Sequence, residues 1–209
     1  MKIICKTKLY PPPVVRETRI RIKLDDPESL TWGIRQLTLA EGRERAVVDW
    51  GDGTTTEVTA SGSQEHIYAQ TGEYEVRISD DLSQLQCLMR GGTSMYQRVY
   101  APMIREFSSD AALLTNFGVD GFYRAVNLST LQCEESGVSD LGRWTLQYCT
   151  GLVGRLDFPR VNTIATESFS GSTGITELHF SKANEETIEA LAGYATCFGA
   201  ANAEIFFDL

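Results

Sequence analysis

The 209-residue sequence has only two histidines, His66 and His179, and only six basic residues after position 98. Nucleic acids and anionic membrane surfaces are bound chiefly through lysine and arginine, so this shortage argues against either as the main partner. Residues 99–209 also carry 14 acidic groups and a net charge of −8, against −1 for residues 1–98. We interpret the acidity as a source of solubility.

Long apolar runs are absent as well. None approaches the roughly 18 residues that a membrane helix needs, and residues 1–10 lack the apolar stretch of a signal peptide. Secretion is therefore unsupported unless a leader has been removed. The cysteines are five in number, without a CxxC pair or a zinc-binding spacing: Cys5, Cys87, Cys133, Cys149 and Cys197. This pattern favours buried, reduced thiols that pack as small hydrophobes.

Catalytic motifs are equally scarce. The sequence shows no GxSxG, P-loop, HExxH or Rossmann glycine pattern. Composition alone leaves a carboxylate-pair glycosidase open, because aspartate and glutamate are plentiful. We nevertheless predict no catalytic residues, no cofactor and no bound metal.

Short β-strands dominate the first half. Residues 19–24 alternate charged and aliphatic side chains, which is the period-two pattern of a half-buried strand. Residues 46–50 and 54–58 flank Gly51-Asp52-Gly53, and an Asp-Gly turn between two β-rich runs is a strong hairpin signal. Residues 32–39, 66–68 and 74–78 add further β-type segments. Strands at this spacing suggest a β-sandwich.

Two linked motifs then resemble the PKD family, whose domains are immunoglobulin-like sandwiches. The matching residues are Asp49–Gly53, His66, Tyr68, Gly72, Tyr74, Val76 and Ile78, while Val48 departs from the usual tryptophan. The resemblance implies a spacer or recognition module in surface-exposed proteins and no chemistry. Asp49 and Asp52 could be interpreted as calcium ligands, but their place in a tight turn favours local hydrogen bonding instead. His66 is interpreted as a structural donor beside that turn.

The second half contains an internal repeat with an offset of 23 residues. Leu141, Leu146, Cys149 and Leu152 align with Ile164, Phe169, Ser172 and Ile175, and a Thr-Gly pair coincides in both copies. A period of 20 to 29 residues with recurrent leucines indicates a solenoid, in which each unit buries its apolar ridge against its neighbours.

These units resemble the BspA-type leucine-rich repeat. Cys149 falls on the inward cysteine position of that family, and Ser172 replaces it in the next unit. Members are mostly bacterial surface proteins that bind host proteins or carbohydrate, and similar repeats occur in phage-encoded proteins. The resemblance implies no catalytic residues.

The last residues are expected to close the solenoid. Asn184 is placed to cap a helix whose first turn holds Glu185 and Glu186, and residues 204–207 suggest a final strand. We therefore predict a mainly β protein: a PKD-like sandwich over residues 1–82, a junction over 83–98, and a repeat domain over 99–209 whose helix-strand cap spans 183–209. Leu85, Leu88 and Met89 in the junction are expected to pack between the two parts.

Two functions from different classes fit these patterns. The first is a bacterial recognition or adhesion module that binds a protein or glycan through the exposed strand face of the repeats. Trp144 and Tyr148 are candidate anchors, although either fits the core equally well. His179 is a third candidate contact residue, because alternation places it on the solenoid surface. The second is a structural or decoration protein of a phage or phage-derived particle. We expect a cell or virion surface location and display in multiple copies.

Overall fold

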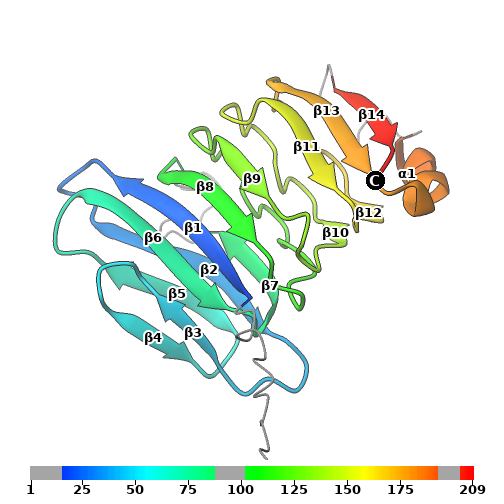
Figure 1. Cartoon of the computed structure of the whole chain (residues 1–209). Coiled ribbons are helices and arrows are strands. Elements are labelled where there is room, and N and C mark those ends of the chain that lie inside the picture. The colour runs from blue at the N-terminus through cyan, green and yellow to red at the C-terminus, as the bar shows by residue number, and fades with distance from the viewer. Residues whose placement is uncertain (1–15, 88–101, 193–202) are drawn as a thin grey trace, which may run out of the picture.

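The protein is described by a computed structural model that covers residues 16–87, 102–192 and 203–209. It is mainly β, as expected, and one short α-helix lies in the described part of the chain. The second half winds into a β-solenoid of about four turns, which extends away from the first half (Figure 1).

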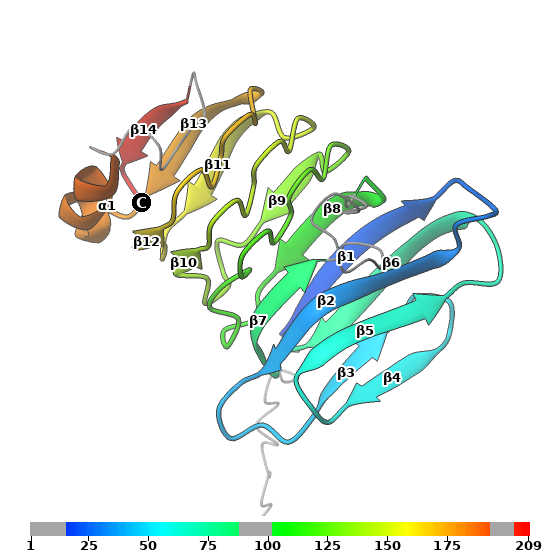
Figure 2. The same cartoon turned by 180° about the vertical axis from the view of Figure 1, so that it is seen from behind.

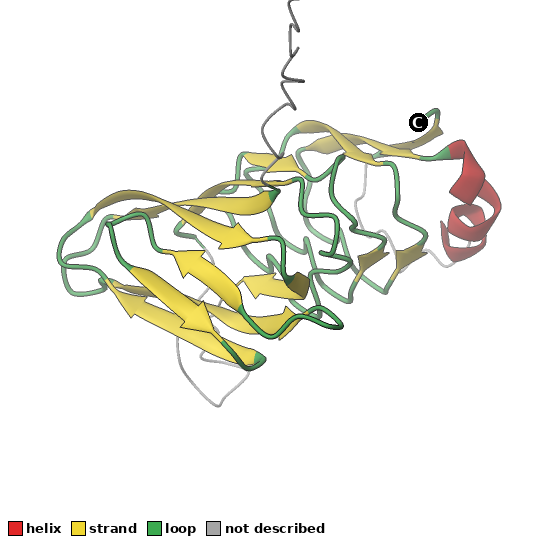
Figure 3. Ribbon diagram, turned by 60° about the horizontal axis from the view of Figure 1, so that its bottom comes forward, coloured by secondary structure: helices red, strands yellow, loops and turns green. Residues whose placement is uncertain are grey.

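The first half forms two sheets that lie face to face (Figure 3). In spatial order the larger sheet contains β4 (Thr55–Val58), β3 (Ala46–Asp49), β6 (Gly72–Ser79), β1 (Glu17–Leu24), β8 (Ile104–Ser109) and β9 (Thr130–Gln132). The smaller sheet contains β5 (Gly62–Ile67), β2 (Thr31–Leu39) and β7 (Leu82–Cys87). Alternate side chains of β1, such as Ile20 and Ile22, are buried between the sheets, as the period-two pattern predicts.

The motifs of the predicted hairpin pack around one turn. Asp52 Oδ1 accepts hydrogen bonds from the backbone and hydroxyl of Thr54 at 3.0 and 2.6 Å, and His66 Nε2 lies 2.7 Å from Asp52 Oδ2. The His66 ring also stacks on Trp50, with 5.0 Å between ring centroids. Asp49 accepts from the backbone N–H of Gly51 at 2.9 Å. Both aspartates therefore have the local turn-forming role expected of them.

The solenoid alternates long strands on one side with short pairings on the other. The long strands are β8, β9, β11 (Gly154–Phe158), β13 (Ile175–Phe180) and β14 (Glu204–Phe207). The short pairings involve Asn116, β10 (Asp140–Leu141) and β12 (Thr163–Ile164), all parallel. Leu146 and Phe169 are fully buried, and so are Cys149 and Ser172. The offset of 23 residues therefore matches the physical period of the coil.

Both sheets of the first half continue directly into the solenoid. On one side β8 pairs antiparallel with β1 and parallel with β9. On the other side Asn116 forms parallel bridges to Gln84 of β7 and to Asp140 of β10 (Figure 2). The apolar core is also continuous, because Phe107 of β8 makes edge-to-face contacts with the coil residues Phe117 and Phe122.

The residues expected to form a junction therefore include a strand. Leu85 in β7 is fully buried, and its backbone N–H donates to the carbonyl of Asn116 in the coil at 3.2 Å. Leu88 and Met89, which are also expected to pack between the two parts, lie outside the described residues. The sequence of β7 predicts a strand only weakly, because the polar residues Ser83, Gln84 and Gln86 interrupt its apolar pattern. β7 is stabilised as a strand by its pairing with β2, which its own sequence pattern does not predict.

The described cysteines are buried free thiols, as predicted: Cys87, Cys133 and Cys149. Burial raises the pKa of the Cys149 thiol to about 12, so the group is a neutral hydrophobe at physiological pH. Cys5 and Cys197 lie outside the described residues.

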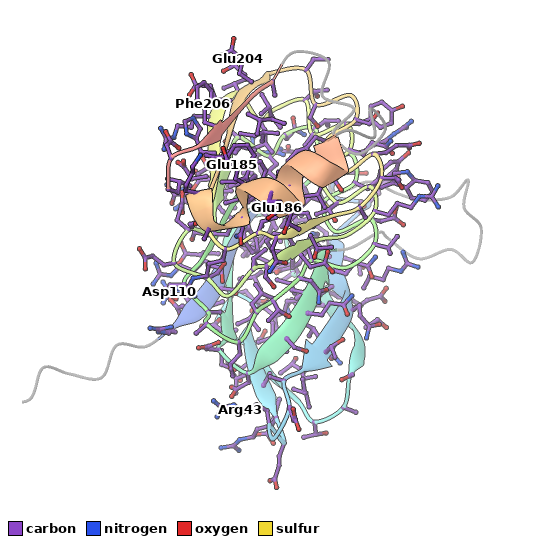
Figure 4. All side chains as sticks on the ribbon, turned by 90° about the vertical axis from the view of Figure 1, so that its right-hand side faces the viewer. Arg43, Asp110, Glu185, Glu186, Glu204 and Phe206 are labelled. Carbon is purple, nitrogen blue, oxygen red and sulfur yellow. The ribbon has the colours of Figure 1, made fainter. Side chains whose placement is uncertain are left out.

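The end of the solenoid matches the predicted cap in outline, with one correction. α1 (Glu185–Ala192) lies across the end of the coil, Ile188 is fully buried, and β14 occupies the expected residues (Figure 4). Asn184, however, ends a short 3₁₀ turn, η2 (Lys182–Asn184), and Ser181 caps that turn by accepting from Ala183. The Asn184 amide instead donates to the Val161 carbonyl at 3.0 Å. The local pattern predicts that Asn184 caps the helix, but a hydrogen bond to a neighbouring coil takes its side chain instead.

Candidate binding surface

The long connections of the solenoid form a third side, here called the turn face. It consists of residues 117–128, 142–153 and 165–174, which connect each short pairing to the next long strand. Several exposed apolar side chains lie on these segments: Val119, Val126, Tyr148 and Val153. Exposed apolar groups gathered on one face mark candidate interaction sites.

Six side chains from three successive coils line a shallow hollow of about 230 Å³ on this face. This turn-face cluster consists of Tyr123, Arg124, Trp144, Gln147, Tyr148 and Glu167. The Arg124 guanidinium lies 5.5 Å from the ring centre of Tyr123 and 5.1 Å from that of Tyr148. Both distances are those of a cation–π contact, so two aromatic rings from different coils hold this guanidinium in place.

Glu167 ties the other half of the cluster together. Its Oε2 accepts hydrogen bonds from Trp144 Nε1 at 2.7 Å and from Gln147 Nε2 at 3.1 Å. The Trp144 ring also carries the Arg143 guanidinium 4.0 Å from its centre. Residues from neighbouring coils therefore fix the orientation of the indole, which lowers the entropy that a partner must remove on binding.

The backbone beneath the cluster adopts a left-handed conformation at two equivalent positions of each coil. Asp120, Trp144 and Glu167 occupy the first position with φ between 60° and 64°, and Arg124 and Tyr148 occupy the second with φ of 58°. Each such non-glycine residue costs about 1 kcal/mol. Hydrogen bonds between coils, such as Tyr148 N–H to the Ser170 carbonyl at 2.8 Å, hold the backbone there.

In the next coil Gly171 occupies the position equivalent to Tyr148, with φ of 75°. A Cβ atom on Gly171 would lie 2.3 Å from Cδ1 of the Tyr148 ring, so the ring rests directly over this glycine. The missing side chain at 171 thus leaves the space in which Tyr148 lies flat on the surface.

Two of the three candidate anchors lie in this cluster. Tyr148 is 40% exposed and Trp144 is half-buried, so neither belongs to the core. Both lie on the turn face, whereas the expected binding surface was the strand face. Sequence reasoning missed Tyr123, Arg124, Gln147 and Glu167, although the offsets from Arg124 to Tyr148 and from Trp144 to Glu167, 24 and 23 residues, are close to one repeat. Residues one repeat apart occupy equivalent positions of successive coils, so this spacing could have predicted that they share one face.

The third candidate, His179, is not an exposed contact residue. It lies on the outward side of β13, as alternation predicts, but only 3% of it is exposed. Phe206 of β14 stacks on its ring, with 4.5 Å between centroids, and Asp208 and Glu177 flank its two nitrogens. The prediction of a surface contact is therefore wrong, because the neighbouring strand covers the imidazole.

A further surface, here called the strand face, carries many paired charges. It is formed by the outward side chains of β8, β9, β11, β13 and β14 and is continued by β1 and β6. Arg21 contacts Glu106 at 3.0 Å, and Arg155 contacts Asp157 at 2.6 Å. Exposed ion pairs of this kind contribute about 0–1 kcal/mol each, and a partner must desolvate them to bind. The strand face is consequently the poorer recognition surface.

Two further observations concern metal binding and membrane-spanning helices. Within the described ranges, no three histidine, cysteine, aspartate or glutamate side chains are arranged to hold a metal ion. No helix among these residues is long and apolar enough to cross a membrane.

Comparison with known proteins gives no relative for this chain. A scan against protein-family models finds no matching family, and searches of curated proteins and of solved structures also find no match. The resemblances to PKD domains and BspA-type repeats therefore remain predictions.

Proposed function

We propose that the protein is a non-catalytic recognition module that binds a protein or glycan surface through the turn-face cluster. The observation that carries this proposal is the composition of the cluster: tyrosine, tryptophan and arginine are the residue types enriched at binding hot spots. They are held by contacts between coils before any partner arrives, as pre-organised binding requires.

The architecture also supports a binding role. We propose that the two facing sheets form an immunoglobulin-like, PKD-type sandwich and that the coils are leucine-rich repeats of the BspA type. Both families are associated with bacterial surface recognition. Each coil adds one set of outward side chains at a fixed spacing, so a shallow site can extend over three coils without a deep pocket.

Both histidines have structural partners that favour recognition over turnover. His66 is bonded to Asp52, and both His179 nitrogens are occupied by carboxylates. Thr54 Oγ1 lies 3.5 Å from His66 Nε2, but the Thr54 hydroxyl donates to Asp52 Oδ1 at 2.6 Å, so its proton is not directed at the imidazole as general-base activation requires.

A second candidate is a structural or decoration protein of a phage or phage-derived particle. The continuity of both sheets and of the core across the two halves favours it, because the chain then forms one stiff body. Neighbouring capsid or tail genes would support this alternative, and a gene for a secreted precursor would support the cell-surface role.

Binding should be tested with the whole chain coupled to beads, because many copies convert weak single contacts into measurable retention. The probes are an array of neutral and acidic oligosaccharides and a set of purified extracellular proteins. Tyr148→Asn removes the exposed ring at a position where asparagine tolerates positive φ. Arg155→Gln on the strand face is the matched control.

We expect saturable binding that Tyr148→Asn weakens at least tenfold and Arg155→Gln leaves within a factor of two, with both variants folded by circular dichroism. Saturable binding that depends on Arg155 and ignores Tyr148 would place recognition on the strand face. Turnover of any probe, abolished by one carboxylate substitution, would contradict a non-catalytic role.

A further inference from the structure

His179 is a buried titratable group with partners on both ring nitrogens, and the turn-face site does not use it. It lies on β13, is 97% buried, and stacks flat against Phe206 with 10° between the ring planes. Its Nδ1 lies 2.7 Å from Asp208 Oδ1, and its Nε2 lies 2.9 Å from Glu177 Oε2.

This geometry requires the protonated ring. A neutral imidazole has one N–H donor and one nitrogen lone pair, whereas an ionised carboxylate only accepts. A neutral His179 would therefore direct a lone pair at one of the two carboxylates from hydrogen-bond distance. The imidazolium satisfies both, since it donates from each nitrogen.

The charges facing His179 come from every strand packed beside it. Arg155 and Asp157 lie on the neighbouring β11 and pair with each other, Glu177 lies on β13, and Glu204 extends from β14 at the position paired with Glu177. Asp208 follows β14. Arg155 is the one cation in this set, and it is paired with Asp157, whereas Glu177, Asp208 and Glu204 are negative, so the surroundings favour a positive ring.

The contact also joins elements that are far apart in the chain. β14 is the last strand of its sheet and pairs only with β13 among the described strands. The hydrogen bond from His179 to Asp208 spans 29 residues, and the stacked Phe206 belongs to β14 itself. We propose that His179 is a pH-sensitive clamp that holds β14 on the end of the solenoid while its ring is protonated and weakens that hold when the proton is lost.

The expected pH range follows from the direction of the shifts. Burial lowers the pKa of His179, but the hydrogen bonds to Asp208 and Glu177 outweigh it, and the net pKa is raised. The hydrogen bond from His179 in turn lowers the pKa of Asp208. A raised histidine pKa means that the stabilisation is complete below the unfolded-state pKa and is lost as pH rises through the folded-state pKa. On the acid side it is lost as pH falls through the lowered pKa of Asp208.

The clamp can be tested by hydrogen exchange and histidine titration of the whole chain by NMR. His66→Asn leaves His179 as the single histidine, which assigns its imidazole signal. Protection factors of residues 205–207 are then compared with those of residues 20–22 in β1 between pH 5.5 and 9. Protection factors already correct for the acceleration of exchange by hydroxide, and the ratio to β1 removes any pH dependence of the stability of the whole fold. Asp208→Asn is the decisive variant, because the amide oxygen still accepts from Nδ1 but the charge is gone.

We expect His179 to titrate above about 6.5, the ordinary value for histidine. Relative protection of β14 should fall through that pH by roughly tenfold for each unit by which the folded-state pKa exceeds the unfolded-state one. Asp208→Asn should move the titration to lower pH and flatten the step in β14. A His179 that titrates at or below 6.5, or a β14 whose relative protection ignores pH, would overturn the proposal.

Discussion

The two halves of this chain provide hydrogen-bond partners for their buried backbone N–H and C=O groups in different ways. In residues 16–87 antiparallel strands pair along most of their length, and β1 and β6 exchange hydrogen bonds over eight residue pairs. In residues 104–180 the strands have two to six residues and pair in parallel with one another, and much of the backbone lies in turns. Long strands satisfy their own polar groups through the ladder, whereas turns need other partners.

The coil supplies those partners from its interior. Ser172 Oγ donates to the Leu146 carbonyl at 2.5 Å and accepts from the Cys149 N–H at 2.9 Å. Thr145 and Ser168, one repeat apart, donate to carbonyls within their own turns at 2.7 and 2.6 Å. Between the facing sheets the buried hydroxyls of Thr18 and Ser109 bond to each other, and Ser109 also accepts from the backbone N–H of Ala111, where the strand has ended. Small polar residues at repeat positions are therefore part of the core of the coil.

The largest expected effect tests whether the halves are separable. A fragment of residues 1–82 lacks β7 and β8, which are the partners of β2 and β1. Because it exposes both edges and part of the core, we expect it to show no cooperative unfolding. Circular dichroism and urea titration of this fragment and of the whole chain make the comparison. A β-rich spectrum with a sharp transition would establish 1–82 as a domain of its own.

The next effect concerns the interior of the coil. The Cys149 thiol donates to the Phe122 carbonyl at 3.0 Å and is fully buried. Cys149→Asp should destabilise the fold by about 3–5 kcal/mol, since it buries a charge without a partner. Cys149→Ser should cost only about 1 kcal/mol, because a hydroxyl can donate to the same carbonyl. The free energy of unfolding in urea measures both.

Cys87 provides the matched control in the first half. Its thiol is also buried, in β7, but it makes no hydrogen bond to another described residue. Cys87→Ser should therefore cost more than Cys149→Ser, by about 1–2 kcal/mol, since it leaves a buried hydroxyl unsatisfied. Equal costs at the two sites would show that the interiors do not differ in this respect. Native Cys149 should also resist a bulky maleimide.

The smallest effect concerns the turn of the first hairpin. The Thr54 hydroxyl is the main cause that lowers the pKa of Asp52 to about 2, and the His66 ring contributes. Asp52→Asn keeps an acceptor for Thr54 but loses the charge, so it should cost about 1 kcal/mol at pH 7 after allowance for solvent screening.

A lowered carboxyl pKa stabilises above the unfolded-state value, and the benefit is lost as pH falls through about 2. The difference between Asp52→Asn and the parent chain should accordingly shrink between pH 4 and pH 2 in urea titrations. A difference that stays constant over this range would mean that the charge of Asp52 contributes nothing.

Much of the secondary structure was predictable because it follows from local pattern. Alternation at residues 19–24 gave β1, the Gly51-Asp52-Gly53 turn gave the β3–β4 hairpin, and the tail residues gave α1 and β14. β7 was missed, since its polar residues conceal a strand that only pairing with β2 stabilises. Trp144 and Tyr148 were recognised as candidate anchors, but their face was not, because both lie in turns outside the alternating strands.

By itself the sequence determined the mainly β class, the period of the coil and the inward position of Cys149, since each depends on the spacing of apolar residues along the chain. The tertiary structure decided that both sheets run on into the solenoid, that Arg124 lies between two tyrosines from different coils, and that Phe206 covers His179. These contacts join residues at least 20 positions apart or link several coils at once. Their geometry is set by how the coils stack, which no local pattern encodes.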